Sequence, residues 1–148
     1  MHVTFRRLDD AASIPKAAHR GDAGFDLSAS RAVDLLPGER ALVPTGLAIE
    51  IPDGFAGLVV PRSGLAIRNG ISVVNGPGLL DSGYRGELQV ILINHGQEPV
   101  RIEVGDRIAQ LMVVAVPEIV WREADDLSQS ERGASGFGST GGFGGSDR

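Results

Sequence analysis

The sequence predicts an all-β fold, and three observations support this prediction. Along the 148 residues, polar and apolar side chains alternate with a period of two more often than with the 3.6-residue period of a helix. Twenty-one glycines and eight prolines divide the apolar runs into short segments. A chain of this size buries roughly 70% of its unfolded surface, which is enough for one compact core. Many short strands joined by regular turns predict a sandwich or a jelly roll.

The expected strands are short apolar runs separated by turn residues such as Pro37-Gly38. Val3, Phe5 and Leu8 open the fold, and an irregular stretch over residues 13–21 follows them. Strands are then expected at residues 33–36, 40–43, 47–51, 55–61, 71–74, 87–94, 100–103 and 107–116.

A single short helix is expected over residues 65–68. Ser63 is a suitable N-cap, and Asn69-Gly70 supplies a left-handed ending. Free N–H groups at the amino end of this helix, next to the guanidinium of Arg62, favour an anion such as phosphate. The alternative is a capped turn beside a solvated arginine.

Charge and composition exclude several classes of protein. The formal net charge of -5 argues against a surface for long nucleic acids, because such surfaces depend on many Lys and Arg contacts. The absence of cysteine excludes disulfide frameworks and Cys-based zinc sites. No apolar run is long enough to span a bilayer. We therefore expect a soluble cytoplasmic protein that binds neither membranes nor nucleic acid stably.

The composition changes after Trp121, which predicts a domain over residues 1–121 and a connector with a terminal segment over residues 122–148. The glycine-rich terminal part buries too little apolar surface to fold alone. One interpretation is a flexible linker. The other is an anion-binding segment, because its glycines let backbone N–H groups approach a ligand while Arg132 and the hydroxyls of Ser139 and Thr140 add donors.

Two aspartates and one glutamine are candidate functional residues. Asp81 lies between two turn signals, where it either stabilises a turn or accepts a proton from water as a general base. Asp26 lies near a glycine and either closes a turn or holds a metal-bound water. Gln110 shares parity with Ile108 and Met112, which places its amide on an expected buried face and requires a structural or ligand partner.

Five segments in order resemble the five motifs of the homotrimeric dUTP diphosphatase (dUTPase) family. They are DAGFDL at 22–27, PRSGLA at 61–66, GLLDSGYRGE at 78–87, RIAQL at 107–111 and RGASGFGSTG at 132–141. The resemblance implies a jelly-roll β barrel assembled as a homotrimer, with active sites shared among subunits. It also implies a flexible glycine-rich C-terminal arm.

The activity implied by this resemblance is hydrolysis of the phosphoric anhydride in dUTP, which releases dUMP and pyrophosphate. Such an enzyme limits uracil in DNA and supplies dUMP for dTTP synthesis. Asp81 resembles the base that activates the water attacking the α-phosphorus. Asp26 resembles the aspartate that helps to place Mg²⁺ through water, while triphosphate oxygens hold most of the metal's coordination shell.

The resemblance also implies a set of substrate-binding residues. The phosphates would contact Arg62, Ser63, Gly64 and Gln110, whereas uracil and deoxyribose would contact Asn75 and Tyr84. A lid over the bound nucleotide would consist of Arg132, Phe137, Gly138, Ser139 and Thr140.

Two rival interpretations remain open at this point. The first is an enzyme resembling dCTP deaminase, which shares the barrel but releases ammonia. The second is a non-catalytic jelly-roll module that only binds a nucleotide or a protein. The chain departs from the usual dUTPase pattern at Leu79-Leu80 and at Ser82, which flank Asp81.

Overall fold

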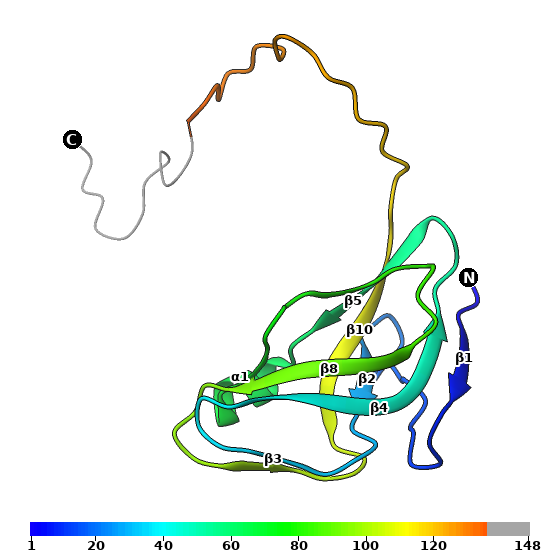
Figure 1. Cartoon of the computed structure of the whole chain (residues 1–148), viewed down its shortest axis with the longest axis vertical. Helices are drawn as coiled ribbons and strands as arrows, with labels where there is room; N and C mark the ends of the chain where they lie inside the picture. Colours follow the sequence, from blue (N-terminus) through cyan, green and yellow to red (C-terminus); the bar gives the residue numbers. More distant parts are fainter. Residues whose placement is uncertain (136–148) are drawn as a thin grey trace, which may run out of the picture. The chain divides into compact units, whose positions relative to one another are not determined.

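The computed structural model of the chain describes residues 1–135. The chain divides into two units, Met1–Glu118 and Ile119–Arg148. Within the described residues, all regular elements belong to the first unit, and strands predominate (Figure 1). The elements are β1 (Thr4–Arg7), β2 (Phe25–Ser28), β3 (Val33–Leu35), β4 (Arg40–Glu50), β5 (Phe55–Val60), α1 (Ser63–Asn69), β6 (Ile71–Val73), β7 (Gly78–Leu80), β8 (Glu87–Asn94), β9 (Val100–Ile102) and β10 (Arg107–Ala115). The all-β prediction is confirmed.

The described strands form three antiparallel sheets. The first has the order β1-β4-β8-β6, the second the order β2-β10-β5-β7, and the third pairs β3 with β9. Strands β4 and β8 run side by side in Figure 1, with β1 flanking β4. Most neighbours in these sheets are distant in sequence, as the crossing connections of a jelly roll require.

Alternating side chains of the two larger sheets make the core. On β8, Leu88, Val90 and Leu92 are buried, while the residues between them are more exposed. Removal of these aliphatic groups from water is the main stabilising term of such a fold. The buried amide of Asn94 is fully paired: its Nδ2 donates to the carbonyls of Leu35 and Glu98 at 3.0 and 2.8 Å, and its Oδ1 accepts the Gly96 N–H.

Strand β4 differs from its prediction. The sequence divides it into two strands at Pro44-Thr45-Gly46, but the structure has one strand over Arg40–Glu50. The pairing with β8 shifts between Pro44 and Ala48, so the extra residues bulge out without ending the strand. Gly46 permits this because it adopts a φ of 69° in the left-handed region.

The strands β2 and β7 are not among the strands that the sequence predicts. Both lie in motifs that the sequence marks only by their glycines and aspartates. Their hydrogen-bonded neighbours, β10 and β5, are far away in sequence, so local patterning alone does not reveal the pairing.

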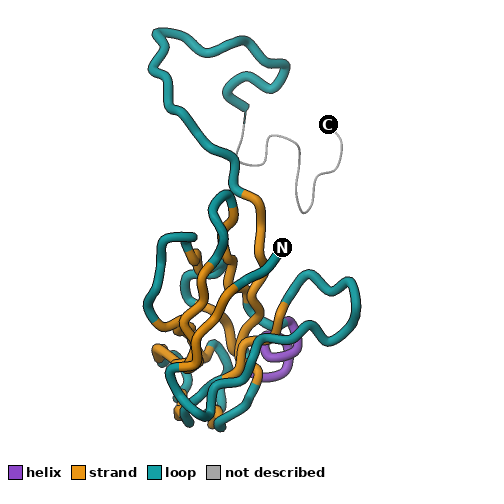
Figure 2. The backbone as a smooth tube through the Cα atoms, turned by 90° about the vertical axis from the view of Figure 1, so that its right-hand side faces the viewer, coloured by secondary structure: helices purple, strands orange, loops and turns teal. Residues whose placement is uncertain are grey.

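Helix α1 is short, as expected (Figure 2), but it begins differently from the prediction. The prediction of Ser63 as N-cap is wrong. Arg62, with extended backbone angles, occupies the N-cap position, and no side chain caps the helix. Gly70 ends the helix in the left-handed conformation, and its N–H bonds to the last turn, as predicted. No helix among residues 1–135 is long and apolar enough to cross a membrane.

Candidate active site

Asp26 is the centre of a polar cluster on the second sheet. Its side chain is only 10% exposed and contacts two arginines: Arg62 Nε lies 3.1 Å from Oδ1, and Arg107 Nη1 lies 3.1 Å from Oδ2. Gln110 Nε2 donates to Oδ1 at 3.2 Å. Arg62 Nη1 also donates to the carbonyl of Arg107 at 3.2 Å, which links the two arginines. Three of the five motif segments therefore meet at one carboxylate.

Strand register brings these residues together. Gln110 on β10 lies opposite Asp26 of β2 on one side and opposite Val60 of β5 on the other. Arg62 follows Val60 by two residues, and residues two apart on an extended chain face the same side. The three strands therefore present their polar side chains in one row across the sheet.

The face assigned to Gln110 from sequence parity is wrong. A bulge between Arg107 and Ala109 changes the parity of β10, so Ala109 and Leu111 point into the core while Gln110 is only partly buried. The predicted need for a polar partner is nevertheless met by Asp26. Gly24 packs directly against this amide, because a Cβ there would lie 3.2 Å from Cδ of Gln110.

Asp81 lies at a second site, a cavity of about 230 Å³ beside the turn that connects β7 of the second sheet to β8 of the first. Asn75, Asp81 and Tyr84 all line it, together with Glu87 and groups from β4 and β8. Asp81 is exposed and directly follows the last residue of β7. The structure thus brings together Asn75, from the turn between β6 and β7, with Asp81 and Tyr84, from the turn between β7 and β8.

Tyr84 is held in this cavity by its own turn. Its hydroxyl donates to the carbonyl of Glu87 at 3.0 Å, and its N–H donates to the carbonyl of Asp81 at 3.1 Å. The ring lies against Gly86, where a Cβ would lie 2.6 Å from Cζ of Tyr84. Gly86 is therefore needed for close approach, and these contacts hold the Tyr84 ring in place.

The two places are separate within one chain. Strands β5 and β7 pair with Leu80 opposite Gly57, so Asp81 lies beside the start of β5. Arg62 follows Gly57 by five residues, which corresponds to roughly 16 Å at the rise of an extended chain. The cavity that Asp81 lines shares no residue with the cavity that Asp26 and Arg107 line.

The remaining predicted residues fall in several positions. Ser63 and Gly64 occupy the first turn of α1, directly after Arg62. Arg132 belongs to the second unit, where its Nε donates to the carbonyl of Ser135 at 2.9 Å. The last predicted lid residues lie outside the described part of the chain; they are Phe137, Gly138, Ser139 and Thr140.

Comparison with known proteins identifies the family and the fold. The dUTPase family model matches residues 10–141. The chain belongs to the dUTPase family. A deoxyuridine 5'-triphosphate nucleotidohydrolase of Thermobifida fusca is 54% identical over 143 residues, covering 96% of this chain and 80% of that protein.

Solved dUTPase structures have the same fold. A mutant dUTPase of Staphylococcus bacteriophage 80alpha, solved with dUpNHpp, superposes with a TM-score of 0.90 at 29% identity and covers 95% of this chain and 98% of its own. A mutant dUTPase of phage phi11 of S. aureus, described with a structural Mg(II) ion, has a TM-score of 0.80 at 25% identity, with coverages of 85% and 98%. The jelly-roll expectation agrees with these neighbours.

Within this dUTPase-family chain, sequence reasoning assigned no role to Arg107 or to Glu87. Arg107 opens the RIAQL segment and contacts Asp26 directly. Glu87 lines the Asp81 cavity, and its Oε1 accepts the N–H of Gly46 at 2.8 Å, which anchors the start of β8 to the β4 bulge. Arg107 is the first residue of its motif segment and Glu87 is the last of its own, and their membership of these segments was the available signal.

Proposed function

We propose that this chain hydrolyses dUTP to dUMP and pyrophosphate, with Asp81 as the general base. The observation that carries the proposal is the cavity in which Asp81, Asn75 and Tyr84 meet within a dUTPase-family fold. The carboxylate of Asp81 can orient a water molecule and accept its proton. The attack of that water on the α-phosphorus then breaks the bond to the leaving pyrophosphate.

The nucleoside end of the substrate occupies the cavity that Asp81 lines. The Asn75 amide and nearby backbone groups recognise the uracil edge, and Tyr84 packs under the deoxyribose where a 2′-hydroxyl has no room. The hydrogen bond between the Tyr84 hydroxyl and the Glu87 carbonyl supports this role, because it holds the ring in one position without any ligand. Substrate selection and the chemical step thus depend on the same turn.

The phosphates bind at the Asp26 cluster and the start of α1. Two arginines share one carboxylate there, so the cluster keeps a net positive charge that favours an anion. Asp26, which also accepts a hydrogen bond from Gln110, orients the Arg62 guanidinium, while Ser63 and Gly64 offer a hydroxyl and backbone N–H groups at the beginning of the helix. Charge that develops on the phosphate oxygens is stabilised by such pre-oriented donors.

The distance between Asp81 and the Asp26 cluster supports a homotrimer with active sites shared between subunits. Asp81 and Arg62 lie roughly 16 Å or more apart along one chain, but both must lie within contact distance of a single triphosphate. Asn75, Asp81 and Tyr84 of one subunit therefore act with the Asp26 cluster of another. The glycine-rich segment with Arg132, Phe137, Gly138, Ser139 and Thr140 closes over the nucleotide as a lid and excludes water.

Mg²⁺ fits this arrangement as an ion held mainly by the substrate. Among residues 1–135, no group of three His, Asp or Glu side chains is placed to hold a metal. Asp26 accepts hydrogen bonds from Arg107 and Gln110 and forms an ion pair with Arg62, and a carboxylate has about four acceptor positions, so it keeps capacity for a water molecule. Asp26 would therefore hold the ion through a water molecule of its hydration shell. When bound, Mg²⁺ neutralises phosphate charge. We place the enzyme in the cytoplasm, with the nucleotide pool.

The substitution Asp81→Asn tests the catalytic assignment. We expect it to lower kcat by about 100-fold to 10,000-fold, while dUTP still binds in calorimetry because the cavity keeps its shape. Asp53→Asn is the matched control, since Asp53 is also an exposed aspartate in a turn, and it should leave kcat unchanged. Undiminished turnover of the Asp81→Asn protein would refute the assignment, and release of ammonia from dCTP by the wild type would favour the deaminase alternative.

A further inference from the structure

Arg85, next to Tyr84, connects the turn of Asp81 to the body of the fold. Its Nη1 donates to the carbonyls of both Ser82 and Tyr84, the latter at 2.9 Å. Its Nη2 lies 3.0 Å from Oε1 of Glu50. One planar guanidinium thus binds two backbone carbonyls of the turn and a carboxylate from a different element.

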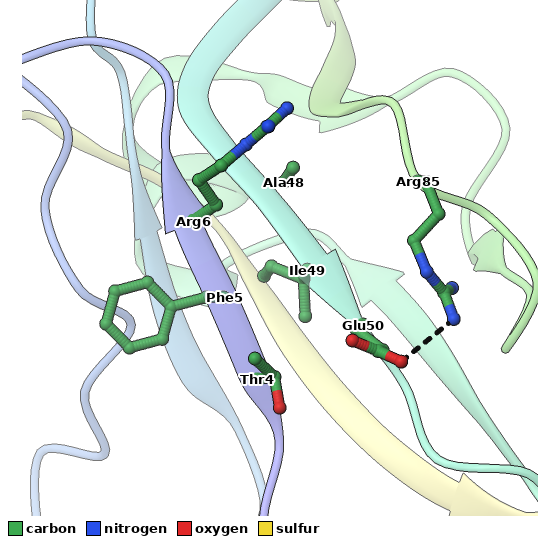
Figure 3. A pocket seen from close by; sticks show the side chains of 7 residues that line it. All are labelled: Thr4, Phe5, Arg6, Ala48, Ile49, Glu50 and Arg85. Atoms are coloured by element: carbon green, nitrogen blue, oxygen red, sulfur yellow. Dashed lines mark hydrogen bonds and ion pairs between the residues drawn. The ribbon is translucent and has the colours of Figure 1, made fainter.

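Glu50 is a firm attachment point because it is the last residue of β4. It lies opposite Thr4 in the pairing with β1, and the same strand pairs along most of its length with β8. Figure 3 shows the Arg85 side chain extending from its loop toward the Glu50 carboxylate, with the contact drawn between them. The two residues line a cavity of about 220 Å³ beside β1.

The turn itself has few other restraints. Asp81, Gly83, Tyr84 and Gly86 are all exposed, and the backbone bond from the Tyr84 N–H to the Asp81 carbonyl is the internal tie of residues 81–84. A segment with two glycines and little burial samples several conformations unless side chains restrain it. A catalytic base must be held to within about 0.5 Å of its working position.

We propose that Arg85 and Glu50 are positioning residues that hold the turn in the geometry in which Asp81 acts. This inference rests on the proposed role of Asp81 as the base. Both side chains are about half exposed, 56% for Arg85 and 52% for Glu50, and exposed ion pairs add little to folding stability. Their contribution therefore appears in kcat rather than in the melting temperature.

The effect on KM should be smaller than the effect on kcat. Tyr84 has its own restraints, the bond from its hydroxyl to the Glu87 carbonyl and the contact with Gly86, neither of which involves Arg85. The sugar contact thus survives when the guanidinium is removed. The carbonyls of Ser82 and Tyr84 lose their donor, which frees the backbone that follows Asp81, whereas the Tyr84 ring keeps its other two contacts.

The test compares Arg85→Met and Glu50→Gln with Arg101→Met. Arg101 is a matched control because it is also about half exposed, and it contacts two carboxylates, Asp34 at 2.7 Å and Glu103 at 3.0 Å, but no turn carbonyl. Its hydrogen bond with Asp34, followed by that with Glu103, raises the pKa of Arg101 above its usual value. The control therefore removes an equally well-paired exposed arginine.

We expect Arg85→Met to lower kcat on dUTP by about 10-fold to 100-fold, the scale of a misplacement near 1 Å, with KM within about threefold and the melting temperature within about 2 °C. Glu50→Gln should lower kcat by a smaller factor. The double variant should be no worse than Arg85→Met alone, because Glu50 acts through Arg85. Arg101→Met should match the wild type.

The same substitution in an Asp81→Asn background separates positioning from general destabilisation. If Arg85 acts through Asp81, adding Arg85→Met to Asp81→Asn lowers the residual rate no further. A further fall there, an Arg85→Met kcat equal to that of Arg101→Met, or losses from Arg85→Met and Glu50→Gln that multiply would each overturn the positioning role. Failure of the proposed function differs from all of these, because the Asp81→Asn protein alone would then keep wild-type turnover.

Discussion

The substitution Asp26→Asn is the most direct test of the polar cluster. It keeps the size of the side chain but removes the negative charge between Arg62 and Arg107. One acceptor oxygen remains for the Arg62 or Gln110 donor, whereas the new amide group faces a guanidinium with which it cannot pair. We expect a clear loss of folding stability.

The magnitude follows from the exposure of the partners. Breaking a fully buried ion pair costs about 3–5 kcal/mol, whereas an exposed pair is worth about 0–1 kcal/mol. The Asp26 side chain is 10% exposed and that of Arg62 is 23% exposed, but that of Arg107 is 56% exposed and its charge is well screened. An intermediate loss of about 2 kcal/mol is expected, which lowers Tm by about 4–8 °C in a domain of this size.

Thermal unfolding followed by circular dichroism measures this loss, with all proteins at one concentration because assembly affects Tm. Asp34→Asn is the matched control. Asp34 contacts Arg101 at 2.7 Å, closer than either contact of Asp26, but both its side chain and that of Arg101 are more than half exposed. Its Tm should stay within about 1 °C of the wild type. Equal losses in the two variants would show that burial does not decide the contribution of these pairs.

Three further predictions concern the substrate. Gly86→Ala places a Cβ against the Tyr84 ring and displaces it, so KM for dUTP should rise by about tenfold, equivalent to about 1.4 kcal/mol; an unchanged KM in steady-state kinetics would exclude a role for the ring in binding. Chelation of Mg²⁺ should lower the rate of dUTP hydrolysis by at least about tenfold, and added Mg²⁺ should restore it; full activity in the chelator would show that the ion is dispensable. A protein that ends at Glu131 should still form the trimer in solution but lose about 100-fold in kcat, and unaltered kinetics would contradict the lid.

The sequence alone determined the fold class and the family. Alternation in segments such as Leu88, Val90 and Leu92 is a local property of strands, and so is the left-handed ending at Gly70. The motif residues are likewise read directly from the chain. These features depend on a few neighbouring residues, so no knowledge of distant contacts is needed to recognise them.

Tertiary structure decided which candidate residues meet. Nothing local places Asp26 beside Gln110, because that pairing joins strands 84 residues apart and depends on a bulge in β10. The same is true of Arg85 and Glu50, which are 35 residues apart. The continuity of β4 through Pro44 and the extended Arg62 at the start of α1 also follow from pairing and packing rather than from propensity. Sheet register is set by the sum of many long-range contacts, whereas periodicity is set residue by residue. For this reason the candidate functional residues can be recognised from the sequence, but their arrangement in space cannot.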